Sequence, residues 1–243
     1  MARKQVFFSL AASAVALGLL SLHPAQASLI VSGSVGGAPT GVTLDNLDAL
    51  TVGGGSPQVT ATGVGVSFAP DAAVVNGSLS GIYAAPFLSG GNGTGFGSPN
   101  QPNGVDATTY LTSGSTGSFS GAQITLTMPG EEQYFGLLWG SVDAFNTLQF
   151  FDGNTLVGTV TGSDVTASPN GNQGVNGTLY VNINSTLNFN KVVATSTQHA
   201  FEFDNIAYNP TQVVPEPASL ALFGSALVGF GLVGRRRRRN NNA

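Results

Sequence analysis

The chain has 243 residues, with 8 Lys and Arg, 12 Asp and Glu, 2 His and no Cys. Only 8% of the residues are charged, against about 25% in an ordinary soluble domain. The lack of cysteine excludes disulfides, thiolate zinc sites and a thiol nucleophile. Two histidines leave little material for a metal triad, and the length suggests one domain with added targeting segments.

The charges are unevenly distributed along the chain. Seven of the eight basic residues lie near the two ends, and residues 28–214 hold eleven acids against Lys191 alone, a net charge of −10. Such a surface repels phosphate backbones, so nucleic-acid binding is excluded as a function.

The first 27 residues have the pattern of a secretory signal peptide. Arg3 and Lys4 precede the apolar stretch 6–22, and Ala25 and Ala27 supply small residues at the −3 and −1 positions of a cleavage site. We expect signal peptidase to cleave after Ala27, so that the protein is exported.

Residues 28–212 have the period-two alternation of β-strands and no convincing helical stripe. Predicted strands cover residues 64–68, 124–128, 133–139, 147–151, 155–161, 179–183, 191–197 and 200–208. Asp152-Gly153-Asn154 predicts a hairpin turn, because Gly and Asn tolerate a positive φ. Frequent turn signals favour an all-β domain, a single antiparallel β-sandwich.

The last of these strands changes its apolar face partway along. Phe201 and Phe203 are at odd positions, whereas Ile206 and Tyr208 are at even ones. A strand cannot exchange its buried face without an inserted residue, so a bulge is expected at Asp204-Asn205 unless both faces are covered. Bulges often redirect side chains at sites, which makes Asp204 the acid of first interest.

Two stretches, residues 89–104 and 168–177, have the composition of loops, and neither carries a phosphate-binding glycine motif. Oxygen ligands in loops suit Ca²⁺. The calcium candidates are Asp143, Asp152, Asp164 and Asp204, with Asn146 and Asn154 nearby. The alternative interpretation is that these acids keep a Gly- and Thr-rich surface soluble.

Glycan binding would use exposed aromatic rings, for which Trp139, Tyr83, Tyr110, Phe96 and Tyr180 are available. Trp139 shares a face with Phe135 and Leu137, which predicts core packing. Tyr180 lies on the opposite face from Leu179, Val181 and Ile183, and Phe96 lies in a Gly-rich loop. We therefore expect Tyr180 and Phe96 to be exposed ligand candidates.

Catalysis has little support in the sequence. A Ser-His-Asp triad would have to use His199, because His23 leaves with the signal peptide, and no G-x-S-x-G motif is present. Glu131 and Glu132 follow Pro129-Gly130 and are expected at a solvated strand entry. We expect no catalytic residues, and therefore no enzyme.

The last 31 residues, 213–243, form a second targeting segment. Pro215, Glu216 and Pro217 precede an uncharged run of 17 residues, 218–234. As a helix this run would span about 25 Å, just enough for a thin bilayer core. The run ends at five arginines, Arg235, Arg236, Arg237, Arg238 and Arg239, which favour the cytoplasmic side and predict a stop-transfer transmembrane helix.

This order of Pro-Glu-Pro, short apolar helix and Arg cluster resembles the PEP-CTERM sorting signal of exosortase substrates. The resemblance implies Pro215, Glu216 and Pro217 as recognition residues and exosortase as a partner during export. It also implies transient anchoring in the inner membrane of a Gram-negative cell that makes exopolysaccharide, then release to the cell surface or extracellular matrix.

Residues 135–143, 146–148, 152–153 and 201–205 also resemble a family of exosortase-dependent surface proteins, whose domain is distantly similar to the jelly-roll sandwiches of carbohydrate-binding modules. The function this predicts is that of a structural or adhesive surface protein without catalytic activity. The alternative is a carbohydrate-binding, lectin-like module that could depend on calcium and bind extracellular polysaccharide. No cofactor is expected apart from such a structural calcium.

Overall fold

The computed structural model describes residues 28–34, 36–116 and 122–213. The predicted signal peptide and the predicted transmembrane helix both lie outside these residues. The strands are β1 (Leu29–Ser34), β2 (Thr43–Asp45), β3 (Gln58–Val59), β4 (Gly65–Phe68), β5 (Ala72–Asn76), β6 (Phe87–Leu88), β7 (Gly104–Val105), β8 (Thr109–Ser113), β9 (Gln123–Gly140), β10 (Asn146–Asp152), β11 (Thr155–Thr161), β12 (Leu179–Ser196) and β13 (Phe201–Asn209). Within the described ranges the helices are the 3₁₀ turn η1 (Ser98–Asn100) and α1 (Gly162–Val165), so the predicted all-β class is confirmed.

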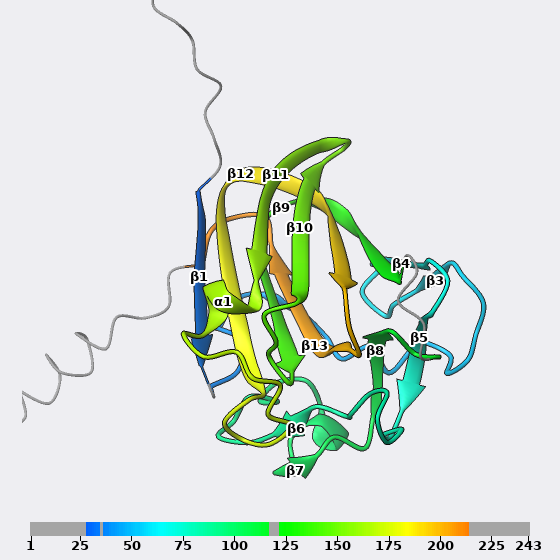
Figure 1. Ribbon diagram of the computed structural model, residues 1–243. Coiled ribbons are helices and arrows are strands. Elements are labelled where there is room, and N and C mark those ends of the chain that lie inside the picture. Colours follow the sequence, from blue (N-terminus) through cyan, green and yellow to red (C-terminus); the bar gives the residue numbers. More distant parts are fainter. Residues whose placement is uncertain (1–27, 35, 117–121, 214–243) are drawn as a thin grey trace, which may run out of the picture.

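Two 18-residue strands, β9 and β12, organise the main sheet (Figure 1). They pair antiparallel twice, through residues 134–139 with 179–184 and through 123–127 with 191–195. The register shifts on both sides of Phe189. The start of β9 and the end of β12 pair with β4 and β10 and form one half of the sheet. The end of β9 and the start of β12 pair with β13 and β1 and form the other half. The main sheet is therefore continuous, and its main path runs in the order β11-β10-β12-β9-β13-β8-β5.

The predicted strands 124–128 and 133–139 are therefore parts of one strand, β9. The solvated position expected for Glu132 is wrong, since this side chain is only 4% exposed. Pro129 and Gly130 do not end the strand, because β9 continues beyond them and pairs with β12 a second time.

The core lies between the two halves of the sheet. Even-numbered residues of β9 such as Leu126 enter it before the register shift, and odd-numbered residues such as Phe135 enter it afterwards. The Phe135 ring contacts Phe150 of β10 edge to face, with 6.0 Å between centroids, and Trp139 stacks on Phe201 at 4.4 Å. The two halves thus pack face to face, and the predicted core position of Trp139 is confirmed.

Two local predictions are also confirmed. The β10–β11 hairpin turns at Gly153, which has a φ of +56°. The β13–β9 register shifts between Asp204 and Ala207, and Asn205 has a φ of +49°, as expected for a bulge. The bulge lets both Phe203 and Ile206 enter the core.

Residues 77–108, here called the covering segment, join β5 to β8 and carry β6, η1 and β7 (bottom of Figure 1). Leu88 and Phe96 of this segment pack on Tyr134, Leu138 and Tyr180 of the sheet and form a second hydrophobic cluster. The segment folds closely on itself, because a Cβ on Gly93 would lie 1.7 Å from the carbonyl oxygen of Asn100.

No helix within residues 28–34, 36–116 and 122–213 is long and apolar enough to cross a membrane.

Candidate ligand pocket

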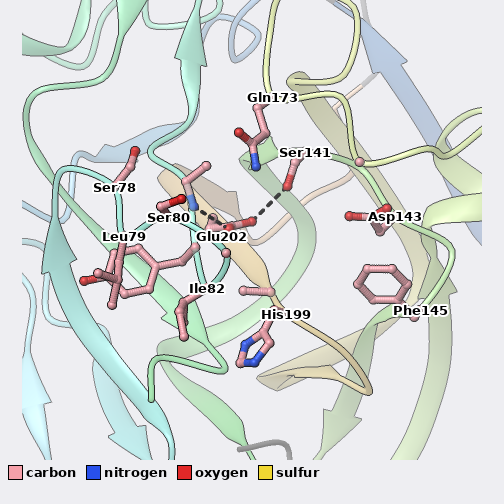
Figure 2. Close-up of a pocket in the computed structure, with 15 residues that line it drawn as sticks. Ser78, Leu79, Ser80, Ile82, Ser141, Asp143, Phe145, Gln173, His199 and Glu202 are labelled. Carbon is pink, nitrogen blue, oxygen red and sulfur yellow. Dashed lines mark hydrogen bonds between the residues drawn. The ribbon is translucent and has the colours of Figure 1, made fainter. Parts of the chain in front are cut away.

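A pocket of about 420 Å³ lies at the end of the sheet where β9 ends and β13 begins. Four segments distant in sequence line it, namely residues 78–84, 141–145, 171–173 and 199–202. Figure 2 shows Ser141, Gln173, Asp143 and His199 arranged around Glu202.

Glu202 forms the base of the pocket. It lies opposite Gly140 on the face of β13 that the covering segment packs against, and it is 2% exposed. Its Oε1 accepts the backbone N–H of Ala84 at 2.8 Å, and its Oε2 accepts the Ser141 hydroxyl at 2.9 Å. Burial raises the pKa of Glu202 to about 7 against the lowering effect of these hydrogen bonds, and the charge of Asp143 adds to the increase.

Asp143 forms one wall, in the connection from β9 to β10. Gly171 has a φ of +65°, and a Cβ there would lie 2.7 Å from Asp143 Oδ1, so a larger residue would be strained and would displace the Asp143 carboxylate. Burial raises the pKa of Asp143 to about 6. The pocket therefore holds two carboxyl groups that change protonation near neutral pH.

The other walls combine polar groups with half-buried apolar surface. Tyr83 contacts Tyr110 edge to face, with 6.4 Å between centroids, and Phe145 is half-buried. Gln173 is exposed and points into the pocket in Figure 2. His199 lies in the β12–β13 turn, as predicted, with Nδ1 3.1 Å from the carbonyl oxygen of Gly114.

The pocket lining combines hydrogen-bonding groups with apolar surface. Ionised carboxylates accept hydrogen bonds from hydroxyl groups, the amide of Gln173 donates and accepts, and Tyr83 and Phe145 offer apolar surface. Within the described ranges, no three His, Asp or Glu side chains lie close enough together to hold a metal ion.

The expectation that Phe96 and Tyr180 are exposed is wrong. Phe96 is 4% exposed and Tyr180 is fully buried, and their rings lie against each other with centroids 6.0 Å apart. Alternation correctly placed Tyr180 opposite Val181 and Ile183. It could not reveal that the covering segment packs on that second face as well.

The calcium candidates do not form one site. Asp143 lies in the pocket, just before the start of β10 at Asn146. Asp152 is exposed at the other end of β10, about 20 Å along the strand from Asn146. Asp204 is buried beneath the covering segment, where the charge of Asp106 acts on it. A common ion for Asp143, Asp152 and Asp204 is therefore excluded by their positions.

Of the remaining candidates, Asp164 and Asn146 have structural contacts and Asn154 is exposed. Asp164 accepts the N–H and hydroxyl of Thr161 and caps α1. The Asn146 amide donates to the Ala200 carbonyl at 3.2 Å, and its oxygen accepts the Ser196 hydroxyl at 2.8 Å. Asn154 is exposed in the hairpin turn.

Sequence reasoning missed Glu202, Ser141 and Gln173 as pocket residues. No motif marks them, because the pocket forms only where the covering segment meets the ends of β9 and β13. The change of apolar face at Asp204 was the nearest signal, two residues from Glu202.

The sorting residues Pro215, Glu216, Pro217 and Arg235–Arg239, with Ala25 and Ala27 at the other end, lie outside the described residues. Val213, just before them, is held by Asn184, whose amide donates to the Val213 carbonyl at 2.8 Å and accepts the Val213 N–H at 2.7 Å.

Comparison with known protein families finds the PEP-CTERM protein-sorting motif at residues 213–239. None of the curated proteins or solved structures compared with the chain matches it. The motif indicates an exported protein that is sorted through the membrane toward the cell surface and processed by exosortase.

Proposed function

We propose, from the PEP-CTERM sorting motif at residues 213–239, that this chain is a structural or adhesive protein of the cell surface or extracellular matrix. Signal peptidase removes residues 1–27, exosortase removes the chain beyond Pro215-Glu216-Pro217, and the domain of residues 28–212 remains outside. It has no catalytic role.

The motif carries this proposal, and the charge distribution supports it. The five arginines resist translocation, while residues 28–214 carry only Lys191 against eleven acids. Net charge of one sign keeps an exported domain soluble and limits its self-association.

Intact-mass analysis of the exported protein tests the proposal. The expected mass corresponds to a chain that starts at Ser28 and lacks Arg235–Arg239. The matched control replaces Pro215, Glu216 and Pro217 by Ala and should keep the arginines in the membrane fraction. A mature, surface-located chain that still carries the arginines would contradict exosortase processing.

A second function, carbohydrate binding, is favoured by the pocket around Glu202. Its carboxyl and amide groups suit saccharide hydroxyls, and Tyr83 and Phe145 provide the apolar surface against which sugar rings pack. An extracellular polysaccharide is the ligand class that we propose.

A glycan array probed with the exported protein tests this function. Gln173→Ala should reduce saturable binding at least tenfold without changing the melting temperature, because Gln173 is exposed. Gln149→Ala, on the half-exposed side of β10, should bind like the wild type. Equal binding by both variants would remove the pocket as the saccharide site, and the absence of any saturable ligand would leave the structural role.

A further inference from the structure

A pair of buried acids, Asp106 and Asp204, lies between the sheet and the covering segment. Asp204 is fully buried and Asp106 is 1% exposed. Neither carboxylate oxygen of Asp204 has a hydrogen-bond partner, nor does Oδ2 of Asp106. Ionised carboxylates normally accept several hydrogen bonds when buried, so three unpartnered oxygens in one region require an explanation.

Both side chains are held in place by their own elements. Asp204 lies opposite Leu138 of β9, on the face that carries Tyr180, at the start of the β13 bulge. Asp106 follows β7, where its N–H donates to the Pro86 carbonyl at 2.8 Å. Oδ1 of Asp106 accepts the N–H of Thr108 at 2.9 Å and its hydroxyl at 2.6 Å, which leaves Oδ2 free.

The two carboxyl groups interact directly. Burial raises the pKa of Asp204 well above its usual range, the Asp106 carboxyl group beside it raises the pKa further, and Asp48 adds a smaller part. No Lys or Arg compensates them within the described residues. The sole candidate there, Lys191, lies elsewhere, 4.8 Å from the centre of the Phe151 ring.

More oxygen atoms are available beside the pair. Asn205, the bulge residue next to Asp204, is fully buried, and neither polar atom of its amide has a hydrogen-bond partner. Buried Asn100 accepts the Thr108 hydroxyl through Oδ1 at 2.9 Å and donates to Asp48 at 3.0 Å. The set is rich in hard oxygen donors and contains no sulfur or imidazole.

We propose that Asp106 and Asp204 together bind a calcium ion that fixes the covering segment to the sheet. Calcium takes six to eight oxygen ligands from carboxylates, amides, backbone carbonyls and water, in flexible geometry. Two carboxylates match the charge of one Ca²⁺, and the amide of Asn205, which follows Asp204 and has no hydrogen-bond partner, is a further oxygen candidate. Ligands beyond the carboxylates would be amide or backbone oxygens and water.

The competing explanation is a proton shared between the two carboxyl groups, as occurs when two acids cannot both ionise. The two explanations differ in their response to calcium and to pH. Calcium requires both groups to be ionised, so it would bind more tightly as the pH rises. A shared proton would be lost as the pH rises, and the fold would lose stability without any calcium effect.

Thermal unfolding of the exported protein in calcium, magnesium or chelator tests the proposal. At a calcium concentration about one hundred times the dissociation constant, the melting temperature should rise by about 5–10 °C. Asp204→Asn and Asp106→Asn should each abolish this rise. Asp152→Asn, a matched change at an exposed acid, should keep it.

Equilibrium dialysis with calcium on the wild-type protein covers the case in which the variants fail to fold. One tightly held ion per chain at neutral pH, lost when the pH is lowered, is expected. No bound calcium, or a melting temperature that is equal in calcium and chelator and falls as the pH rises, would overturn the proposal in favour of the shared proton. Neither result bears on exosortase processing or on saccharide binding at Glu202.

Discussion

At the residue scale, burial rather than ion pairing controls the acids of the sheet. Glu202 and Glu132 have their pKa raised to about 7, and Asp143 to about 6, with burial as the first cause in each case. Lys191 is the sole Lys or Arg among the described residues. No cation lowers the pKa of any of these three acids, so ion pairing does not offset the cost of their desolvation.

The pH dependence of stability follows from the pKa of Glu202. The folded pKa of about 7 lies above the unfolded value of 4.5, so the folded state binds a proton more tightly. The contribution of Glu202 to the free energy of unfolding should therefore be largest below about pH 4.5. It should fall by up to about 3 kcal/mol as the pH rises to 7 and stay level above that.

Glu202→Gln should remove this part of the slope, since an amide cannot ionise and can still accept from Ala84 and contact Ser141. Urea unfolding measured from pH 4 to 8 checks this, with exposed Glu131→Gln as the matched control. Glu132 and Asp143 shift in the same direction, so a smaller slope should remain. An unchanged slope in Glu202→Gln would contradict the assignment.

At the element scale, single irregular residues let a long strand direct odd-numbered side chains into the core on one side of the irregularity and even-numbered side chains on the other. The bulge at Asn205 moves the core positions of β13 from Phe203 to Ile206, and the shifts around Phe189 do the same for β12. Without these irregularities, strict alternation would turn half of each strand away from the core.

Deletion of Asn205 should therefore be far more damaging than the loss of one surface residue. It would exchange the faces of Ile206, Ala207 and Tyr208 and move two large core side chains away from the core, at a cost of several kcal/mol. Circular dichroism melting and native-state proteolysis check this. Deletion of Gly55, in an exposed loop, is the control and should leave a cooperatively folded domain.

At the scale of the whole molecule, both ends of the described chain attach to one stretch of β12. The Ser28 N–H donates to the Thr186 hydroxyl at 3.0 Å, and the Ser28 carbonyl accepts the Thr186 N–H at 3.2 Å. Val213 is paired with Asn184 two residues away, and Gln212 donates to the Ser185 carbonyl at 2.8 Å. Ser28 and Val213, the first and last described residues, thus lie beside the same stretch of β12.

Asn184→Ala should release the segment that leads into the sorting motif, because both hydrogen bonds to Val213 depend on its amide. Limited proteolysis of the precursor should cleave near Val213 at least several-fold faster, while the core melting temperature changes little. Asn188→Ala, an exposed asparagine of the same strand, is the control. Equal cleavage rates in the two variants would show that the contact does not restrain the segment.

Local features of this protein were predictable from the sequence alone. The PEP-CTERM motif, the strand periods, the hairpin at Gly153 and the bulge at Asn205 depend on neighbouring residues, so their chemistry is visible in the order of the amino acids. The core position of Trp139 followed from the same alternation.

Only the tertiary structure decided which surfaces remain open. Phe96, Tyr180 and Glu132 are buried because a segment distant in sequence or a continuous bent strand covers them, and alternation along one strand carries no information about such cover. For the same reason the pocket at Glu202 and the pairing of Asp204 with Asp106 had no sequence signature, although the change of apolar face marked Asp204 itself. Each is built where the covering segment meets β13, and burial by that contact gives these carboxyl groups their unusual chemistry.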